Sequence, residues 1–429
     1  MKRGFTLIEL LAVIVILAII VIIATPIVLN IINDTKNSSQ EKSVEMYINS
    51  VELSITNNML NDLNNKPSGT YRIDDDGKKI IKIEEGKEVG NPIKVEYKGE
   101  GLTEGTIEIK EGKVTKLRGT KINGKYVAKV YDSIEFFDEL PESTLTSSYN
   151  FNAKIKTLVA GKDEKYTTQD KIVTSIEFFS YGELPDGYTK EKLLKLEHVD
   201  VSNNQDKSIL ALYDKNGNVY IYSDKLIVFN KESSVMFSNF NIMTNLKFGL
   251  IDTSEVNSMS GMFFNDHNLL SLDLSHFDTR NVTNMSSMFS YCGSLKSLNI
   301  SSFNTSKVTN MHKMFGYSSD LEKLDLTHFD TSNVTDMSFM FANCYLSELN
   351  INNFNTKKVK SMREMFRVNN LAKLDLSTFS TVQVLDMSNM FYGCSKLKLI
   401  QVSNNWIIGE NTDITNIFDR CGTNIVTLK

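Results

Sequence analysis

One carboxylate and one peptide junction near the start of the chain stand where they could do chemistry. Glu9 lies at the head of an almost unbroken apolar run that continues to Leu29, and a Gly4-Phe5 junction lies just before it. A carboxylate at the centre of a helix in lipid costs roughly 2.5–3.5 kcal/mol, and less towards the membrane interface. Glu9 therefore needs a cationic partner.

A short basic leader before an apolar stretch is typical of a secretory signal peptide. Here the Gly4-Phe5 junction precedes the apolar run, and a carboxylate heads that run. The 20 residues from Leu10 to Leu29 would measure about 30 Å as a helix, which is enough to span a bilayer. The basic leader predicts a cytoplasmic start with the rest of the chain outside. A plain transmembrane anchor is the alternative, but it would not require Glu9 or the junction.

These first thirty residues resemble the N-terminus of type IV prepilins and pseudopilins. In that family a prepilin peptidase cuts after the glycine, here Gly4, and methylates the new N-terminal phenylalanine, here Phe5. The resemblance implies that Glu9 pairs with the amine of Phe5 on a neighbouring pilin subunit and sets the register of assembly. Pro26 falls where many members carry a proline, and it would kink the helix by removing a backbone hydrogen bond.

The other reactive side chains show no catalytic pattern. The 429 residues have a net charge of −5 with acids and bases interspersed, so we expect no nucleic-acid partner. No zinc-protease, serine-hydrolase or nucleotide-binding motif occurs, and we expect no enzyme, no cofactor and no metal site. The four cysteines form no C-x-x-C pair and occupy equivalent repeat positions; they are Cys292, Cys344, Cys394 and Cys421. We expect buried free thiols, with a Cys394–Cys421 disulfide as the open alternative.

The pattern along the chain predicts an α+β protein of five segments. They are a leader (1–4), a transmembrane and spine helix (5–62), a pilin-like β domain (63–131), a β-rich linker and solenoid N-cap (132–235) and a repeat solenoid (236–429). The spine continues beyond the membrane because apolar residues recur at helical spacing at Val44, Ile48, Val51, Ile55 and Met59. Alternating residues over 106–110 and 113–117 predict an antiparallel sheet against this helix.

The C-terminal half repeats itself. Met-Phe pairs begin at residues 236, 262, 288, 314, 340, 365 and 390, a period of 25–26 residues, and such a period predicts a solenoid. Each unit combines an alternating segment such as Leu295–Ile300, expected as a short strand, with an apolar face at i, i+3, i+4 and i+7. Met285, Met288, Phe289 and Cys292 have this spacing, which predicts a two-turn helix.

Residues 236–429 closely resemble the BspA-like leucine-rich-repeat surface proteins of bacteria, whose units read L-x-x-L-D-L-S-x-F-D-T-S-x-V-T-x-M-x-x-M-F-x-x-C. Residues 321–344 match this pattern nearly throughout. The resemblance implies extracellular display and adhesive or host-facing binding, and it implies no chemistry. Many relatives reach the surface by other anchors, so the pilin-like start is a departure from that family.

One polar column is a candidate binding face. Between the two strand leucines, acid and amide alternate in successive repeats, at Asp273, Asn299, Asp325, Asn350 and Asp375. Equivalent positions stack about 5 Å apart, so the column would line the outer face of the strands. One interpretation is a hydrogen-bonded ladder that solubilises and registers the strands. The other is a polar surface that binds an extracellular protein or glycan.

Together these features predict an exported type IV pilin-like surface protein, a minor or tip pilin, that displays a leucine-rich-repeat domain for adhesion. Its expected partners are prepilin peptidase, other pilin subunits, the cytoplasmic membrane and an unidentified extracellular ligand. It would be a single-pass membrane protein with its C-terminal part outside, at the cell surface or in a pilus after processing. Two alternatives stay open: a membrane-anchored monomer that only uses the prepilin route, and a pseudopilin of a secretion or DNA-uptake system.

Overall fold

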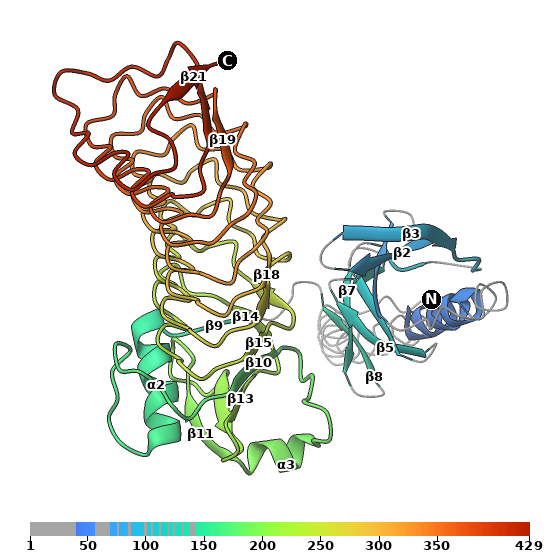
Figure 1. Ribbon diagram of the computed structural model, residues 1–429. Helices are drawn as coiled ribbons and strands as arrows, with labels where there is room; N and C mark the ends of the chain where they lie inside the picture. Colours follow the sequence, from blue (N-terminus) through green and yellow to red (C-terminus); the bar gives the residue numbers. More distant parts are fainter. Residues whose placement is uncertain are drawn as a thin grey trace, which may run out of the picture. The chain divides into compact units, whose positions relative to one another are not determined.

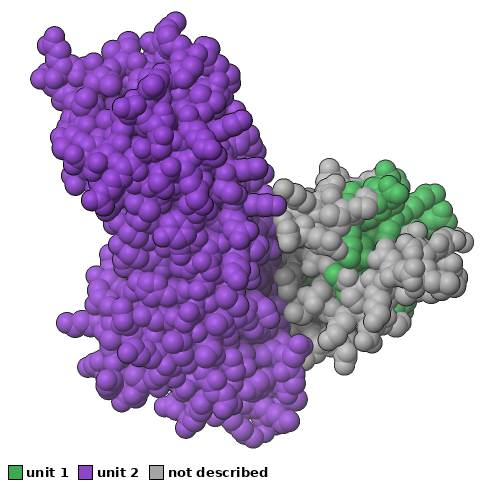
Figure 2. Space-filling view, in the orientation of Figure 1, with its two compact units in different colours: residues 1–139 green, residues 140–429 purple. Residues whose placement is uncertain are grey.

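The computed structural model describes residues 40–55, 69–74, 77–84, 87–97, 101–103, 106–110, 113–118, 120–122, 125–130, 133–137 and 142–429. The chain divides into two compact units, residues 1–139 and 140–429, coloured separately in Figure 2. Gly4, Phe5, Glu9, Pro26 and the predicted membrane segment lie outside the described residues. Within those residues, no helix has the length and apolarity needed to cross a membrane.

The first unit packs a helix against an antiparallel sheet. Residues 40–55 are helical, and Val44, Tyr47, Val51 and Ile55 are at most 1% exposed on the face that the helical spacing predicts. They share one core with sheet residues such as Ile107, while the Tyr47 hydroxyl donates to the Gly77 carbonyl at 2.8 Å. The helix is thus fixed to the sheet by both apolar burial and a hydrogen bond.

The other described residues of this unit form mainly two sheets. The first is antiparallel in the order β3-β2-β1-β4-β5, and the second is antiparallel in the order β6-β7-β8. The strands are β1 (Gly69–Ile73), β2 (Lys79–Glu84), β3 (Lys87–Lys94), β4 (Thr106–Lys110), β5 (Lys113–Arg118), β6 (Thr120–Ile122), β7 (Lys125–Val130) and β8 (Ser133–Phe137). The β4–β5 pair is the hairpin predicted from the alternating residues.

The second unit begins with a mixed α/β segment that leads into the repeats (Figure 1). This segment contains a sheet in the order β11-β12-β13-β10-β15 and a parallel sheet in the order β9-β14-β16. Helix α2 buries Phe151 and Ile155 in the same core as the apolar residues of the repeats. The elements are β9 (Glu142–Thr144), α2 (Ser148–Ala160), β10 (Ser175–Phe179), α3 (Lys190–Leu194), β11 (Glu197–Asp200), β12 (Leu210–Tyr213), β13 (Asn218–Tyr222), β14 (Leu226–Val228), β15 (Asn245–Lys247) and β16 (Ile251–Asp252). The structure therefore joins residues 140–235 to the repeats as one unit.

From residue 236 the chain runs through successive coils, one per Met-Phe repeat (Figure 1). Short parallel strands lie along one side, namely β17 (Ser271–Asp273), β18 (Ser297–Asn299), β19 (Lys373–Leu376), β20 (Leu399–Val402) and β21 (Val426–Leu428). A second column of parallel bridges connects residues 25–27 apart from Glu232 to Asp413. Neighbouring coils are thus held together along two sides.

The predicted short helix in each repeat is wrong. Within residues 195–429 the structure has turns and short strands and no α-helix, and the Met-Phe segment forms turns. Met285, Ser287 and Phe289 donate their backbone N–H groups to Asn310, His312 and Met314 of the next coil, at 2.7–3.0 Å. A helix would use these N–H groups within its own segment, so bonding between coils replaces it.

The backbone conformation also excludes a helix. Two residues per coil adopt positive φ, for example Ser287 at 56° and Tyr291 at 63°. The next coil has positive φ at the equivalent residues, Lys313 and Tyr317. This left-handed region is costly for any residue with a Cβ atom. The predicted apolar set is nevertheless buried, because Met285, Met288, Phe289 and Cys292 are all 0% exposed.

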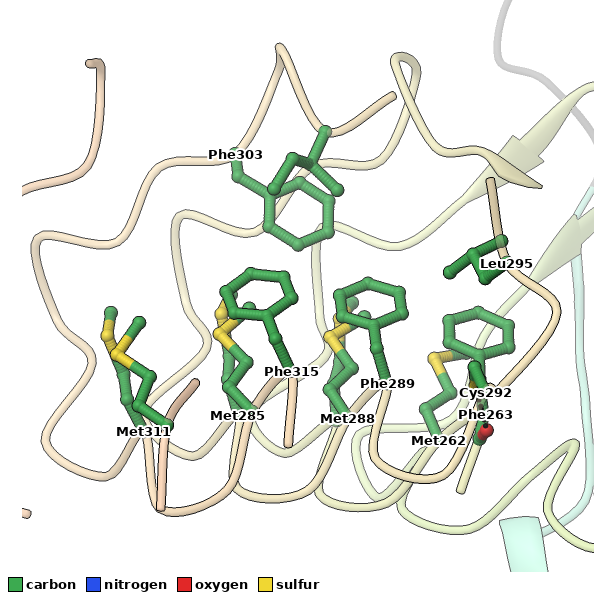
Figure 3. Packing of buried hydrophobic residues seen from close by; sticks show 14 of the residues in the cluster. Met262, Phe263, Met285, Met288, Phe289, Cys292, Leu295, Phe303, Met311 and Phe315 are labelled. Carbon is green, nitrogen blue, oxygen red and sulfur yellow. Dashed lines mark hydrogen bonds between the residues drawn. The ribbon is translucent and has the colours of Figure 1, made fainter. Parts of the chain in front are cut away.

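The core between the two sides is a stack of identical side chains. From Phe237 to Phe418, the ring centroids of successive phenylalanines are 5.5–5.9 Å apart, and the ring planes are 3–9° from parallel. Figure 3 shows part of this stack, with methionines such as Met285 and Met288 beside the rings. Each coil alone would leave its rings exposed, so stacking supplies the burial that stabilises the unit.

A buried threonine in each coil adds a polar link across the stack. Thr305 Oγ1 donates to the Asp330 carbonyl at 2.9 Å and accepts the Asp330 N–H at 2.8 Å, in the next coil. The same exchange recurs at equivalent positions, and these threonines are at most 2% exposed: Thr253, Thr279, Thr305, Thr331 and Thr356. One hydroxyl thus pairs with two backbone groups of the next coil, in part-buried hydrogen bonds.

We predict that Thr305→Val lowers the free energy of unfolding by about 1–3 kcal/mol, because it removes the hydroxyl partner of the Asp330 N–H and carbonyl in part-buried hydrogen bonds. Thr305→Ser keeps the hydroxyl and serves as the control, with a much smaller loss. Urea denaturation followed by circular dichroism measures both variants. Equal losses for valine and serine would show that the hydroxyl is not the stabilising group.

A second prediction tests the turn conformation. Ser287→Gly should be more stable than Ser287→Ala by about 1–2 kcal/mol, because alanine is strained at positive φ and glycine is not. The equivalent residue of the preceding coil is already Gly261, with φ of 59°. Thermal unfolding of the two variants gives the order of stability, and in a helix that order would be reversed by about 1 kcal/mol.

Candidate functional site

The predicted polar column follows the strand side of the coils. Asp273 pairs with Asn299 in the β17–β18 ladder, and Asp325 forms a parallel bridge with Asn350. Asp375 pairs with Gln401 in the β19–β20 ladder. The expected register between these neighbouring positions is therefore present, with Asn299 and Asp375 half-buried and the other three side chains exposed.

Each of these side chains closes a turn within its own coil. The Oδ1 atom of Asp273 accepts the N–H of Ser275 at 3.0 Å, and Asp325 and Asp375 accept from the residues two positions later in the same way. Asn299 and Asn350 make the equivalent bond at 3.3 Å. This is the Asx turn, in which a short side chain imitates a backbone turn. The column has a local structural role, and its role in binding stays a prediction.

Asp375 has a cationic partner. Its Oδ2 atom lies 2.5 Å from Lys429 Nζ. Partial burial by itself would raise the pKa of Asp375, but hydrogen bonds from Lys429 and Ser377 outweigh it and hold that pKa below its ordinary value. The carboxylate is thus charged at neutral pH and already paired.

The cysteines at equivalent repeat positions contact the backbone of neighbouring coils. All four cysteines are free, with Cys292, Cys344 and Cys394 buried and Cys421 half-buried. The Cys292 thiol donates to the Phe263 carbonyl at 3.0 Å, and Cys344 and Cys394 contact the equivalent carbonyls of their preceding coils. Burial raises the pKa of the Cys344 thiol to about 12, so the thiol is protonated at neutral pH.

A buried cation lies where α2 meets the first coils, and the sequence pattern did not indicate it. Lys156 is 1% exposed, and its ammonium donates to the carbonyls of Tyr166, Thr168 and Ser238 at 2.5–3.1 Å. Burial lowers the pKa of Lys156 to about 8, against the opposing effect of nearby carboxylates, Asp266 first. The carbonyl oxygens thus bind an ammonium as structural ligands.

Asp266 is fully buried at the position that cysteines hold in other coils. Its Oδ1 atom accepts the N–H of Phe240 at 2.9 Å. Burial raises the pKa of Asp266 well above its ordinary value, against the opposing effects of the Phe240 N–H and of Lys156. Lys156 and Asp266 each have structural contacts with the first coils, and neither is arranged as a nucleophile beside a base.

The remaining titratable groups do not converge on a site. Among the described residues, no cluster of three or more His, Cys, Asp or Glu side chains could hold a metal ion. His328 Nε2 lies 2.9 Å from the Ile300 carbonyl of the previous coil, and His312 Nδ1 lies 2.7 Å from Ser338 Oγ of the next. Burial lowers the pKa of His312 despite nearby Asp336. Both histidines thus link neighbouring coils.

The threonine column is the polar feature that sequence reasoning missed. Threonine recurs at the same place in every central unit, three residues before the valine. Recurrence alone would have identified the position, but nothing in the sequence shows that the hydroxyl bridges two backbone groups of the next coil. The same holds for Lys156, a lysine on a helix whose buried face also contains Phe151 and Ile155.

Comparisons with known proteins give two matches. Residues 1–25 match the family described as "Prokaryotic N-terminal methylation motif". Residues 231–324 and 318–427 match the family described as "Mycoplasma protein of unknown function, DUF285", which corresponds to the coils. No curated protein and no solved structure matches the chain.

The methylation motif indicates a type IV pilin-like exported protein, and it implies processing by a prepilin peptidase and pilin-type assembly. It also indicates a membrane-anchored or surface-exported location. The chain therefore joins a prokaryotic N-terminal methylation motif to a BspA-like DUF285 repeat region.

Proposed function

We propose that this chain is a minor or tip pilin that displays its repeat region outside the cell for adhesion. The observation that carries the proposal is the combination of a methylation motif over residues 1–25 with a separately folded unit of 140–429. The motif supplies a route of export and assembly. The stacked coils offer a long lateral surface with no catalytic constellation, and such a surface suits binding to another macromolecule.

The coils have the features of a leucine-rich-repeat solenoid, and we propose that this is their architecture. Each coil contributes 25–26 residues, a short parallel strand segment and a buried Leu, Phe and Met set. The mixed segment before them shields the first coil, as terminal caps do in such arrays. The turn-based Met-Phe segment takes the place that a helix occupies in other repeat proteins.

Assembly would depend on Glu9 and the new N-terminus. Cutting after Gly4 exposes the amine of Phe5, whose positive charge can neutralise Glu9 of a neighbouring subunit inside the lipid. The helix over residues 40–55 would continue this spine, with Met46 and Leu53 48% and 61% exposed on its free face. A subunit whose second unit has 290 residues would crowd a filament, which favours a sparse or terminal position.

The Glu9→Ala variant tests assembly. We expect the protein in the sheared filament fraction to fall at least about tenfold, because the amine of a neighbouring Phe5 loses its partner in lipid. Its amount in the membrane fraction should stay at the wild-type level. Immunoblotting of both fractions measures this, with Glu45→Ala, an exposed carboxylate of the 40–55 helix, as the control.

Wild-type amounts of Glu9→Ala in sheared filaments would contradict assembly through this residue. Absence of the wild-type protein from filaments, with an intact membrane pool, would favour the membrane-anchored monomer. Finding it only with a periplasm-spanning secretion or DNA-uptake apparatus would favour a pseudopilin.

A further inference from the structure

One exposed ridge of the coils changes character along the stack. Its first column holds the residue two positions before each coil's buried valine, and its second column holds the residue after that valine. The first column reads Arg280, Ser306, Ser332, Lys357, Val382 and the second reads Thr283, Thr309, Thr335, Lys360, Leu385. The ridge is thus largely polar in its early coils, lysine in the next and aliphatic in the one after that.

Backbone hydrogen bonds fix these residues as neighbours. The N–H of Leu385 donates to the Lys360 carbonyl, and the N–H of Lys360 donates to the Thr335 carbonyl, both at 2.8 Å. Coils joined in this way lie about 5 Å apart. The lysine layer therefore lies one coil from the aliphatic layer, and the threonine layer lies one coil further.

The aliphatic layer is exposed on the side of the stack. Val382 is 62% exposed and Leu385 is 60% exposed, although the next coil already bonds to this one through Asp413 N–H and the Leu385 carbonyl. That next coil adds Ile407 and Ile408, which are 50% and 47% exposed; the Ile407 N–H donates to Thr381 Oγ1 at 2.7 Å. A contiguous exposed apolar patch is unusual on a soluble surface and marks a contact site.

Positive charge lies on one side of the aliphatic layer, in the lysine layer, and acids lie beside it and in the coil beyond it. Lys357, Lys358 and Lys360 are all exposed within four residues of chain. The nearest acid beside Leu385 is Asp386, which is half-buried and accepts the N–H and hydroxyl of Ser388 with Oδ1. Glu410, Asp413 and Asp419 are exposed acids of the following coil, and the Asp413 N–H donates to the Leu385 carbonyl. The lysine layer therefore presents a net positive charge beside the aliphatic side chains.

We propose that this ridge docks on the surface of a bilayer with anionic phospholipid headgroups. Aliphatic side chains of an interfacial protein enter about 5–10 Å below the headgroups, and lysines one layer behind them meet the phosphates. The order aliphatic, lysine, threonine along the ridge matches the order acyl boundary, headgroup, water. The inference rests on the proposed display of the repeats outside the cell, and it identifies the surface that they contact.

The repeat itself supplies conservative variants. Val382→Ser with Leu385→Thr, and separately Lys357→Ser with Lys360→Thr, restore the residues that Ser332 and Thr335 provide one or two coils earlier. Leu270→Ser, at a residue that is 49% exposed at the start of the strand side, is the matched control. Circular dichroism melting of every variant checks that the fold is intact.

The full chain, held on beads through an N-terminal tag, is mixed with fluorescent vesicles of phosphatidylcholine with or without phosphatidylglycerol. The apolar N-terminal segment gives the same background with both vesicle types, and we expect added capture with phosphatidylglycerol that weakens with salt. The double lysine variant should lose roughly 30-fold in vesicle affinity, and the double aliphatic variant at least about tenfold. The Leu270→Ser control should bind like the wild type, because Leu270 lies outside the ridge.

Capture of both vesicle types alike, or equal capture by all variants, would overturn the proposal. Loss with the lysine variant alone would also overturn it, because that result describes a soluble polyanion site such as one for an acidic polysaccharide. Antibody labelling of intact cells tests display separately. Labelled cells with vesicle-inert protein would refute the docking surface alone, and unlabelled cells with vesicle-binding protein would refute the proposed display alone.

Discussion

Alternate amides of the Met-Phe segment donate to carbonyls of the following coil, and the rest of the second unit depends on these bonds. The bonds set the distance between coils, which places the phenylalanine rings 5.5–5.9 Å apart. They also bring each buried threonine within reach of the next coil's backbone. The threonine hydrogen bonds and the phenylalanine stack therefore both follow from the register in which neighbouring coils are bonded.

This register has a cost in backbone conformation. Two residues in each Met-Phe segment take positive φ, including Phe339 at 60° and Val368 at 52°, where a side chain with a Cβ atom is strained. The strain persists because the coils on both sides hold the segment through hydrogen bonds. A single repeat would not hold it, so the repeats must fold as an array.

The sequence predicts the repeat, its period and the buried set, because identical apolar positions recur every 25–26 residues. It does not predict the conformation of the Met-Phe segment. The spacing of Met285, Met288, Phe289 and Cys292 suits one face of a helix, and a run of turns buries the same positions. Gly261 and Asn389 favour positive φ, but Lys313 and Phe339 at the equivalent position do not, so the local signal is uneven. Bonds to the next coil hold the turns in every repeat.

The functional residues divide in the same way. The methylation motif is a local pattern, and the family match over residues 1–25 recovers it without any structure. The strand column could be placed in register from the period alone, but its Asx turns depend on the backbone two residues later. Lys156 and the lysine-to-aliphatic ridge become visible only when segments distant in sequence are brought together.

Hydrogen exchange of the interior coils tests the bonds between coils most directly. The amides of Met285, Ser287, Phe289 and Tyr291 bond to the next coil, whereas those of Met288 and Ser290 bond within their own turn at 3.3 and 3.1 Å. The account predicts that the first group exchanges slowly and together, at the rate of unit unfolding, and that the second group is less protected. Uniform protection within each segment, or fast exchange of the first group in the folded protein, would contradict it.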